Sequence, residues 1–167
     1  YIVVAIWLSL YGFNDIAMSL LYLYHRNDKV VMEPLPEFPD ITVKLAVYNE
    51  RYVVERLLDA VAALDWPCDK LHIQVLDDST DETTGLARAR AEFHRAHGVD
   101  VVVIRRTDRV GYKAGALQAG LAHSTSPFVA LFDGDFMPAS DFLKRMMPAF
   151  VGRPNLGWVQ ARWTHLN

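Results

Sequence analysis

The chain has 167 residues, of which 51% are hydrophobic and 22% are charged, and its formal net charge at pH 7 is −3. This length and composition predict one folded α/β domain with an additional apolar segment, and the acidic balance argues against a general nucleic-acid-binding surface. The single cysteine, Cys68, excludes an internal disulfide and fits a reducing compartment.

The first 24 residues are apolar apart from Ser9, Asn14, Asp15 and Ser19. A helix of about 20 such residues spans a bilayer, so we predict a transmembrane helix over residues 1–25. Basic residues follow directly at Arg26 and Lys29, and by the positive-inside rule they place the next domain in the cytoplasm. The alternative is a buried helix of a soluble domain, which Asp15 favours because a charge near mid-membrane is costly.

Residues 26–40 contain three prolines and are predicted to form an extended linker. The chain begins without a methionine and stops in a polar stretch at residues 164–167. We therefore expect the chain to be a fragment of a longer protein.

From residue 41 onwards, apolar runs of strand length alternate with segments of helical periodicity. Strands are predicted at residues 41–47, 71–76, 99–104, 128–132 and 157–161. Helices are predicted between Asn49 and Trp66 and at residues 81–97, 112–122 and 140–150. Asn49 is expected to cap the first helix, and residues 79–82 and Gly98 to cap the second. This alternation predicts a mostly parallel sheet with right-handed crossovers.

Polar side chains follow the carboxyl ends of four predicted strands. They are residues 48–50, residues 77 and 78, residues 105–113 and residues 133–135. In parallel sheets, ligands bind beyond these strand ends, so the four clusters are expected to converge on one site.

Asp133 and Asp135 directly follow the apolar run over residues 128–132. Aspartate is a poor strand former and costly to bury unpaired, so two at a strand end indicate a divalent-cation site. Mg²⁺ and Mn²⁺ prefer such oxygen ligands and often share them with substrate phosphates. The alternative is a loop whose aspartates only accept hydrogen bonds from nearby backbone N–H groups.

The other clusters have the groups that a nucleotide requires. Asp77 or Asp78 could accept hydrogen bonds from a base or a ribose, and Tyr48 could stack on a base. The residues that could counter phosphate charge are Arg105, Arg106, Arg109 and Lys113. The alternatives are that Asp77 stabilises the next helix, that Tyr48 is a core residue and that the arginines form a solvated face. The chain contains neither a Walker A sequence nor G-x-G-x-x-G.

Five motifs occur in a fixed order along the chain. They are Val-Tyr-Asn-Glu at 47–50, Gln-Val-Leu-Asp-Asp-Ser-Thr-Asp at 74–81, Gly-Tyr-Lys-Ala-Gly-Ala-Leu at 111–117, Phe-Asp-Gly-Asp-Phe at 132–136 with Pro138, and Val-Gln-Ala-Arg-Trp at 159–163. Over residues 39–167 the chain thereby resembles inverting family 2 glycosyltransferases. Within that family it looks most like the cellulose-synthase-like A and C group, the glucomannan and glucan synthases, and their bacterial relatives. The resemblance implies a GT-A fold, a Rossmann-like nucleotide-diphospho-sugar transferase architecture. It also implies that residues 41–167 are the N-terminal, donor-binding part of a glycosyltransferase 2 domain that is truncated at its C-terminus.

The resemblance also implies a role for each motif. The residues that would bind the nucleotide sugar are Val47, Tyr48, Glu50, Asp77, Asp78, Lys113 and Asp133. Of these, Glu50 would lie close to the base or ribose and Lys113 close to the diphosphate. Asp133 and Asp135 would hold Mg²⁺ or Mn²⁺, with Asp135 the more direct ligand. Many relatives have alanine between these aspartates, and Gly134 is expected only to loosen the turn.

The implied activity is that of a membrane-bound hexosyltransferase with a cytoplasmic catalytic domain. The parent protein would transfer a hexose from UDP-glucose or GDP-mannose, with inversion, to a β-glycan acceptor. The family's general base lies in a motif expected beyond Asn167, so we assign no catalytic base and expect the isolated chain to be nearly inactive. One alternative is a non-catalytic, membrane-tethered nucleotide-sugar-binding or interaction domain. Another is a magnesium-dependent phosphatase, which the absence of Ser or Thr shortly after Asp135 disfavours.

Overall fold

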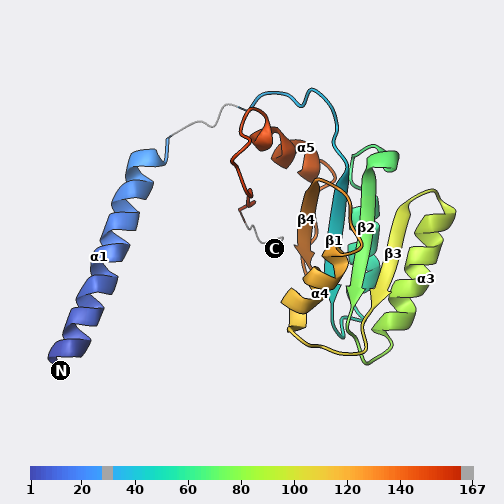
Figure 1. The fold of residues 1–167 in the computed structure, drawn as a ribbon, viewed down its shortest axis with the longest axis horizontal. Helices are drawn as coiled ribbons and strands as arrows, with labels where there is room; N and C mark the ends of the chain where they lie inside the picture. The colour runs from blue at the N-terminus through green and yellow to red at the C-terminus, as the bar shows by residue number, and fades with distance from the viewer. Residues whose placement is uncertain (28–31, 163–167) are drawn as a thin grey trace. The chain divides into compact units, whose positions relative to one another are not determined.

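The computed structural model describes residues 1–27 and 32–162, and the chain divides into two units, Tyr1–Met32 and Glu33–Asn167. The first unit contains the helix α1 (Ile2–His25), none of whose residues is buried (Figure 1). This helix is long and apolar enough to cross a membrane, by length and composition. Asn14 and Asp15 lie within it, so the predicted helix forms without interruption at these two residues.

The described part of the second unit, residues 33–162, is built on a four-stranded parallel sheet. Its strands are β1 (Ile41–Val47), β2 (Leu71–Asp77), β3 (Asp100–Arg105) and β4 (Phe128–Asp133). Its helices are α2 (Val54–Ala62), α3 (Thr83–Ala96), α4 (Tyr112–Leu121) and α5 (Phe142–Met146), with 3₁₀ turns η1 (Cys68–Lys70) and η2 (Met147–Phe150). The strand order is β3-β2-β1-β4, with all four arrows pointing the same way in Figure 1. The predicted parallel sheet is confirmed.

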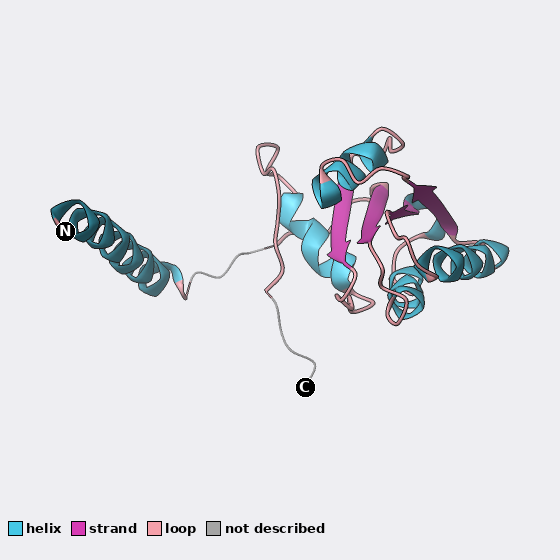
Figure 2. Cartoon of the chain, turned by 90° about the horizontal axis from the view of Figure 1, so that it is seen from below, coloured by secondary structure: helices cyan, strands magenta, loops and turns pink. Residues whose placement is uncertain are grey.

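Helices lie on both sides of the sheet (Figure 2). On one face, alternate residues of β1, among them Val43 and Leu45, are fully buried in a core that includes Leu57 and Leu58 of α2 and Ala87 of α3. Alternation places every second side chain of a strand on the same face, so these apolar positions of the strand meet the apolar stripes of two amphipathic helices. Their burial is the main source of stability for this unit.

The other face of the sheet is more polar and is covered by α4. Lys44 of β1 is fully buried there and donates a hydrogen bond to Gln74 Oε1 at 2.9 Å, while Gln74 Nε2 donates to the carbonyl oxygen of His123 at 2.9 Å. Burial lowers the pKa of Lys44. Gly120 allows the close approach of α4, because a Cβ there would lie 2.7 Å from a methyl carbon of Leu76. The sequence pattern had not predicted this buried lysine.

The predicted strand over residues 157–161 is wrong. These residues contain no strand and instead line a groove of about 800 Å³ beside β4 and α5. A strand exists only where a partner offers a ladder of hydrogen bonds, and an alternating local pattern does not supply that partner. The predicted helix over residues 140–150 is also shorter, because it continues as a 3₁₀ turn at Pro148, which lacks an N–H donor.

Two predicted caps are wrong and one is confirmed. Asn49 has a φ of +55° and accepts a hydrogen bond from the Thr80 N–H at 2.8 Å, so it joins two loops, whereas α2 begins later and ends at Ala62. There is no capping box at residues 79–82, because Asp81 Oδ1 accepts from the Thr83 N–H at 3.0 Å. Gly98, with a φ of +85°, ends α3 as predicted, since its positive φ suits the position after a helix.

The stability of this unit should depend on the protonation of His72. Its Nδ1 lies 2.6 Å from Asp100 Oδ2 and its Nε2 lies 3.5 Å from Asp40 Oδ1. The hydrogen bond with Asp100 raises the pKa of His72 above its usual value. A raised folded-state pKa contributes stability that is complete below about pH 6.5 and is lost as pH rises through the folded-state pKa.

We therefore expect the free energy of unfolding of the full chain in detergent to fall as pH rises from 5.5 to 8.5. His72→Gln should remove this component, which we expect to be below about 1 kcal/mol because the pair is partly exposed. His97→Gln is the matched control, because the His97 ring bonds the Phe93 carbonyl oxygen and not a carboxylate. Equal pH slopes for the wild type and His72→Gln would contradict the assignment.

Candidate functional site

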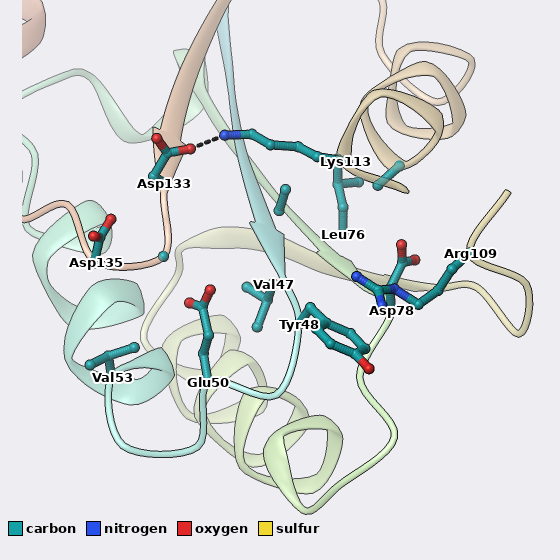
Figure 3. Close-up of a pocket in the computed structure, with 13 residues that line it drawn as sticks. Val47, Tyr48, Glu50, Val53, Leu76, Asp78, Arg109, Lys113, Asp133 and Asp135 are labelled. Carbon is teal, nitrogen blue, oxygen red and sulfur yellow. Dashed lines mark hydrogen bonds and ion pairs between the residues drawn. The ribbon is translucent and has the colours of Figure 1, made fainter. Parts of the chain in front are cut away.

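A cavity of about 540 Å³ lies at the carboxyl ends of β1, β2 and β4 (Figure 3). Its lining residues are Ala46, Val47, Tyr48, Glu50, Val53, Leu76, Asp78, Arg109, Lys113, Ala116, Asp133, Gly134 and Asp135. The strands end level with one another, since Val47 pairs with Asp77 and Ala46 pairs with Asp133. Residues from four distant parts of the sequence therefore meet in one cavity.

Figure 3 shows different chemistry at the two sides of this cavity. Asp133, Asp135 and Lys113 lie toward one side, and we call this the acidic end. Tyr48, Asp78 and Arg109 are drawn toward the other side, which we call the aromatic end. The cavity therefore offers carboxylates and an ammonium at one end, and a ring, a guanidinium and a carboxylate at the other.

At the acidic end, Asp133 Oδ1 forms an ion pair with Lys113 Nζ. The Asp133 side chain is thus bonded to a side chain across the cavity and not to a backbone N–H, unlike the simple loop considered above. Asp135 is exposed to the same cavity. Both carboxylates remain accessible to a ligand, because Asp135 is exposed and the Lys113 side chain that pairs with Asp133 is itself 55% exposed.

The acidic end fits a cation that shares its ligands with a bound molecule. Within residues 1–27 and 32–162, no three His, Cys, Asp or Glu side chains group closely enough to hold a metal ion alone. Mg²⁺ is commonly held by one or two carboxylates with water and substrate phosphates. Asp133 and Asp135 supply such a pair, so the residues present fit a cation bound together with a phosphate group.

Glu50 enters the cavity from the loop that follows β1. Its Oε2 is enclosed and has no hydrogen-bond partner among the residues that the structure describes. Burial raises the pKa of Glu50, the negative charge of Asp135 raises it further, and the Lys113 ammonium opposes the shift. This carboxylate lacks the donors that normally accompany a shielded acid, so it is available to a ligand.

At the aromatic end, Arg109 lies over Tyr48. The guanidinium carbon is 3.3 Å from the Tyr48 ring centroid and 5.2 Å from that of Tyr112. Tyr48 is 39% exposed, so it is not the core residue considered as an alternative. Arg109 Nε is buried without a hydrogen-bond partner. The two side chains form a stacked cation–π pair, and the arginine lies at this end of the cavity instead of beside the acidic end.

Asp78 is held by Arg106, which does not line the cavity. Arg106 Nε donates to Asp78 Oδ1 at 2.8 Å, and Nη2 donates to Oδ2 at 2.5 Å. The same guanidinium donates to the carbonyl oxygens of Val110 and Tyr112 at 3.2 and 3.1 Å. Arg106 therefore joins the carboxylate to the loop that carries Arg109, and it positions both sides of the aromatic end.

Asp77, which was expected to bind the nucleotide sugar, does not line the cavity. It is fully buried and accepts hydrogen bonds from Arg105 Nη1 and the Ser79 N–H, both at 2.9 Å. Burial alone would raise the pKa of Asp77, but the hydrogen bonds from Thr84, Ser79 and Arg105 outweigh it and lower the pKa. As the last residue of β2, Asp77 points toward α3, and of the two aspartates only Asp78 lines the cavity.

Several cavity residues were not predicted as site residues. The unexpected wall residues are Val53, Leu76, Ala116 and Gly134. The stacking of Arg109 on Tyr48 was also not predicted. Leu76 of β2 and Ala116 of α4 both line the cavity, where α4 packs against the sheet. The small residues of the 111–117 motif were the available signal for this close approach, although no spacing rule indicates which of them reach the cavity.

The sequence of residues 42–165 matches the family model described as glycosyl transferase family 2. This chain belongs to glycosyltransferase family 2. It is 42% identical over 134 residues to a probable glucomannan 4-beta-mannosyltransferase 11 of Arabidopsis thaliana, covering 78% of this chain and 30% of that protein. It is 37% identical over 169 residues to glucomannan 4-beta-mannosyltransferase 9 of the same plant, covering 93% of this chain and 32% of that protein. The chain spans about a third of the length of these curated relatives.

A solved structure supports the same family and the GT-A fold. The mannosyltransferase PcManGT from Pyrobaculum calidifontis, in complex with GDP-Man and Mn²⁺, matches with a TM-score of 0.73 and 31% identity. The match covers 89% of this chain and 44% of that one. Staphylococcus aureus TarS residues 1–349 match with a TM-score of 0.57 and 23% identity, which shows the fold alone. The predicted family and its cellulose-synthase-like group are confirmed.

The loop at the aromatic end should depend on Gly115. A Cβ there would overlap the Val110 carbonyl oxygen and lie 2.8 Å from Arg106 Nη1. Because the first of these is a backbone atom, we expect Gly115→Ala to destabilise the fold by about 1–3 kcal/mol. Gly85→Ala in α3 is the control, since no atom lies within 4 Å of its added Cβ. Thermal unfolding should separate the two variants, and equal melting temperatures would contradict this packing.

Proposed function

We propose that this chain is the donor-binding part of a membrane-bound glycosyltransferase that binds GDP-mannose together with Mg²⁺ or Mn²⁺. The observation that carries the proposal is the cavity with Asp133 and Asp135 at one end and Tyr48, Arg109 and Asp78 at the other. A nucleoside diphosphate has matching parts, a flat base at one end and a charged diphosphate at the other. The mannosyltransferase relatives favour GDP-mannose over UDP-glucose.

In this proposal, Asp133 and Asp135 hold the cation and Lys113 contacts the diphosphate. The bound cation would stabilise the negative charge of the leaving diphosphate as a Lewis acid. The Lys113 ammonium adds a second positive charge at the same place. Both are needed because breaking the bond between sugar and phosphate leaves charge on the diphosphate oxygens.

At the aromatic end, the base would be held by a flat surface and a carboxylate. The Arg109 guanidinium already covers Tyr48, so the pair presents one stacked layer to a base. Asp78 offers oxygen acceptors to the N–H groups of a base edge, and Arg106 holds it in place. The apolar side chains of Val47 and Leu76 complete the wall and exclude water from it.

The parent protein would transfer mannose with inversion to a β-glycan acceptor. This requires that the acceptor hydroxyl lose a proton during attack, and we assign no residue of this chain to that step. We therefore expect the isolated chain to bind the donor but to turn over little of it. We also propose that α1 anchors the protein in a membrane with the catalytic domain in the cytoplasm, since Arg26 follows the helix directly.

Calorimetric titration of the full chain in detergent with GDP and with UDP tests the donor site. We expect GDP to bind more tightly than UDP, and more tightly with Mn²⁺ than with EDTA. Asp135→Asn should remove most of the Mn²⁺ dependence, a loss of about tenfold or more, because one of two carboxylate ligands is lost. Asp65→Asn is the control, since Asp65 pairs with Lys144 outside the cavity. Full Mn²⁺ dependence in Asp135→Asn would rule out the metal role.

Lys113 should weaken the binding of the cation alone and strengthen the binding of the nucleotide. Its ion pair with Asp133 must open before that carboxylate can bind a cation. We expect Lys113→Met to raise the affinity for Mn²⁺ alone by several-fold, and to weaken GDP binding in the presence of Mn²⁺. Free Mn²⁺ can be measured by electron paramagnetic resonance, with Lys144→Met as the control. A fall in both affinities would argue against the exchange of Lys113 between Asp133 and the diphosphate.

A further inference from the structure

Gly134, between the two aspartates of the acidic end, is buried against the side chain of Glu50. A Cβ at Gly134 would overlap Oε2 and Cδ of Glu50 and would lie 2.6 Å from its Oε1. The carboxylate of Glu50 thus fills the space that a side chain at residue 134 would need. Figure 3 shows Glu50 extending from the loop after β1 toward the turn that links Asp133 and Asp135.

The position of Glu50 is not explained by hydrogen bonding. Its Oε2 is shielded from solvent and accepts no hydrogen bond from the described part of the chain. The charged groups that act on it are Asp135, which repels it, and Lys113, which attracts it. An acid placed beside another acid, without a donor, is unfavourable unless a positive group joins them. Lys113 supplies one positive charge beside these acids, and a bound cation would supply a further one, so the geometry suits a state in which a cation is also present at this end.

We propose that Gly134 and Glu50 are a matched pair that strengthens cation binding at the acidic end. Gly134 is a positioning residue, because its missing side chain admits the Glu50 carboxylate to the turn. Glu50 acts by its negative charge and not as a third ligand, since the described residues contain no group of three acids close enough to share a metal ion. The inference rests on the proposed function, because it assumes that Asp133 and Asp135 bind a divalent cation.

This role differs from the expectation that Gly134 only loosens its turn. If Gly134 only loosened the turn, replacing it by another small residue would change cation affinity little, and the change would not depend on the identity of residue 50. A matched pair instead predicts that the effect of a change at one position depends on the other. Gly134→Ala would push the Glu50 carboxylate out of the turn, whereas Glu50→Asp would withdraw it by one methylene and make room for the added methyl group.

The test is a double-mutant cycle of Gly134→Ala and Glu50→Asp in the full chain in detergent. The readouts are Mn²⁺ affinity, measured by electron paramagnetic resonance, and the melting temperature in EDTA. We expect Gly134→Ala to weaken Mn²⁺ binding by about tenfold, the range of coupling between residues in contact. We expect Glu50→Asp to weaken Mn²⁺ binding when residue 134 is glycine, and to restore both readouts in the Gly134→Ala background.

The effect of Glu50→Asp on Mn²⁺ affinity thus changes sign between the two backgrounds. A merely structural role of Gly134 would not produce this change of sign. Glu50→Asp acting in the same direction in both backgrounds would overturn the inference, as would wild-type values of both readouts for Gly134→Ala. Gly85→Ala, with open space around its added Cβ, should leave Mn²⁺ affinity unchanged. If the wild-type chain bound no Mn²⁺ with or without GDP, the proposed function would fail and the cation role with it. A sign reversal in the melting temperatures alone would still support the steric pairing.

Discussion

The parallel register of β1 with its two neighbours is the constraint on which the rest of the structure depends. Val47 pairs with Asp77 on one side and Ala46 with Asp133 on the other, so three strands end at the same level. β1 is buried along most of its length, including the charged Lys44. A slip of one residue would turn every side chain of the strand to the opposite face, so burial on both faces holds the register and thereby the positions of the loops around the cavity.

Most charged and aromatic groups of the cavity are already paired without a ligand. Lys113 pairs with Asp133, Arg106 with Asp78, and Arg109 with Tyr48. The Arg106–Asp78 pair is largely buried, so the bidentate contact compensates the desolvation of both charges, whereas the Lys113–Asp133 pair stays about half exposed. Ligand binding then becomes an exchange of partners for these groups, whereas Glu50 Oε2, which has no hydrogen-bond partner among the described residues, would gain one from a new positive charge.

Periodicity and turn chemistry correctly predicted four of the five expected strands, the parallel sheet and the meeting of the polar clusters at one edge. They failed where the outcome depended on a distant partner. Residues 157–161 were predicted as a strand but form none, and they line a groove together with β4. Asn49 bonds Thr80 and does not cap the helix that follows it. The buried Lys44 was missed because its acceptor, Gln74, lies on a neighbouring strand.

The sequence by itself determined the family, the fold class and most residues of the cavity, because these follow from local patterns and ordered motifs. Tertiary structure decided which of two adjacent aspartates lines the cavity. Asp77 ends β2 on the side of α3, and Asp78 turns to the cavity, a choice made by strand register. It also decided that Gly134 makes room for Glu50. Contacts between residues 84 positions apart depend on how the sheet packs, which no local pattern encodes.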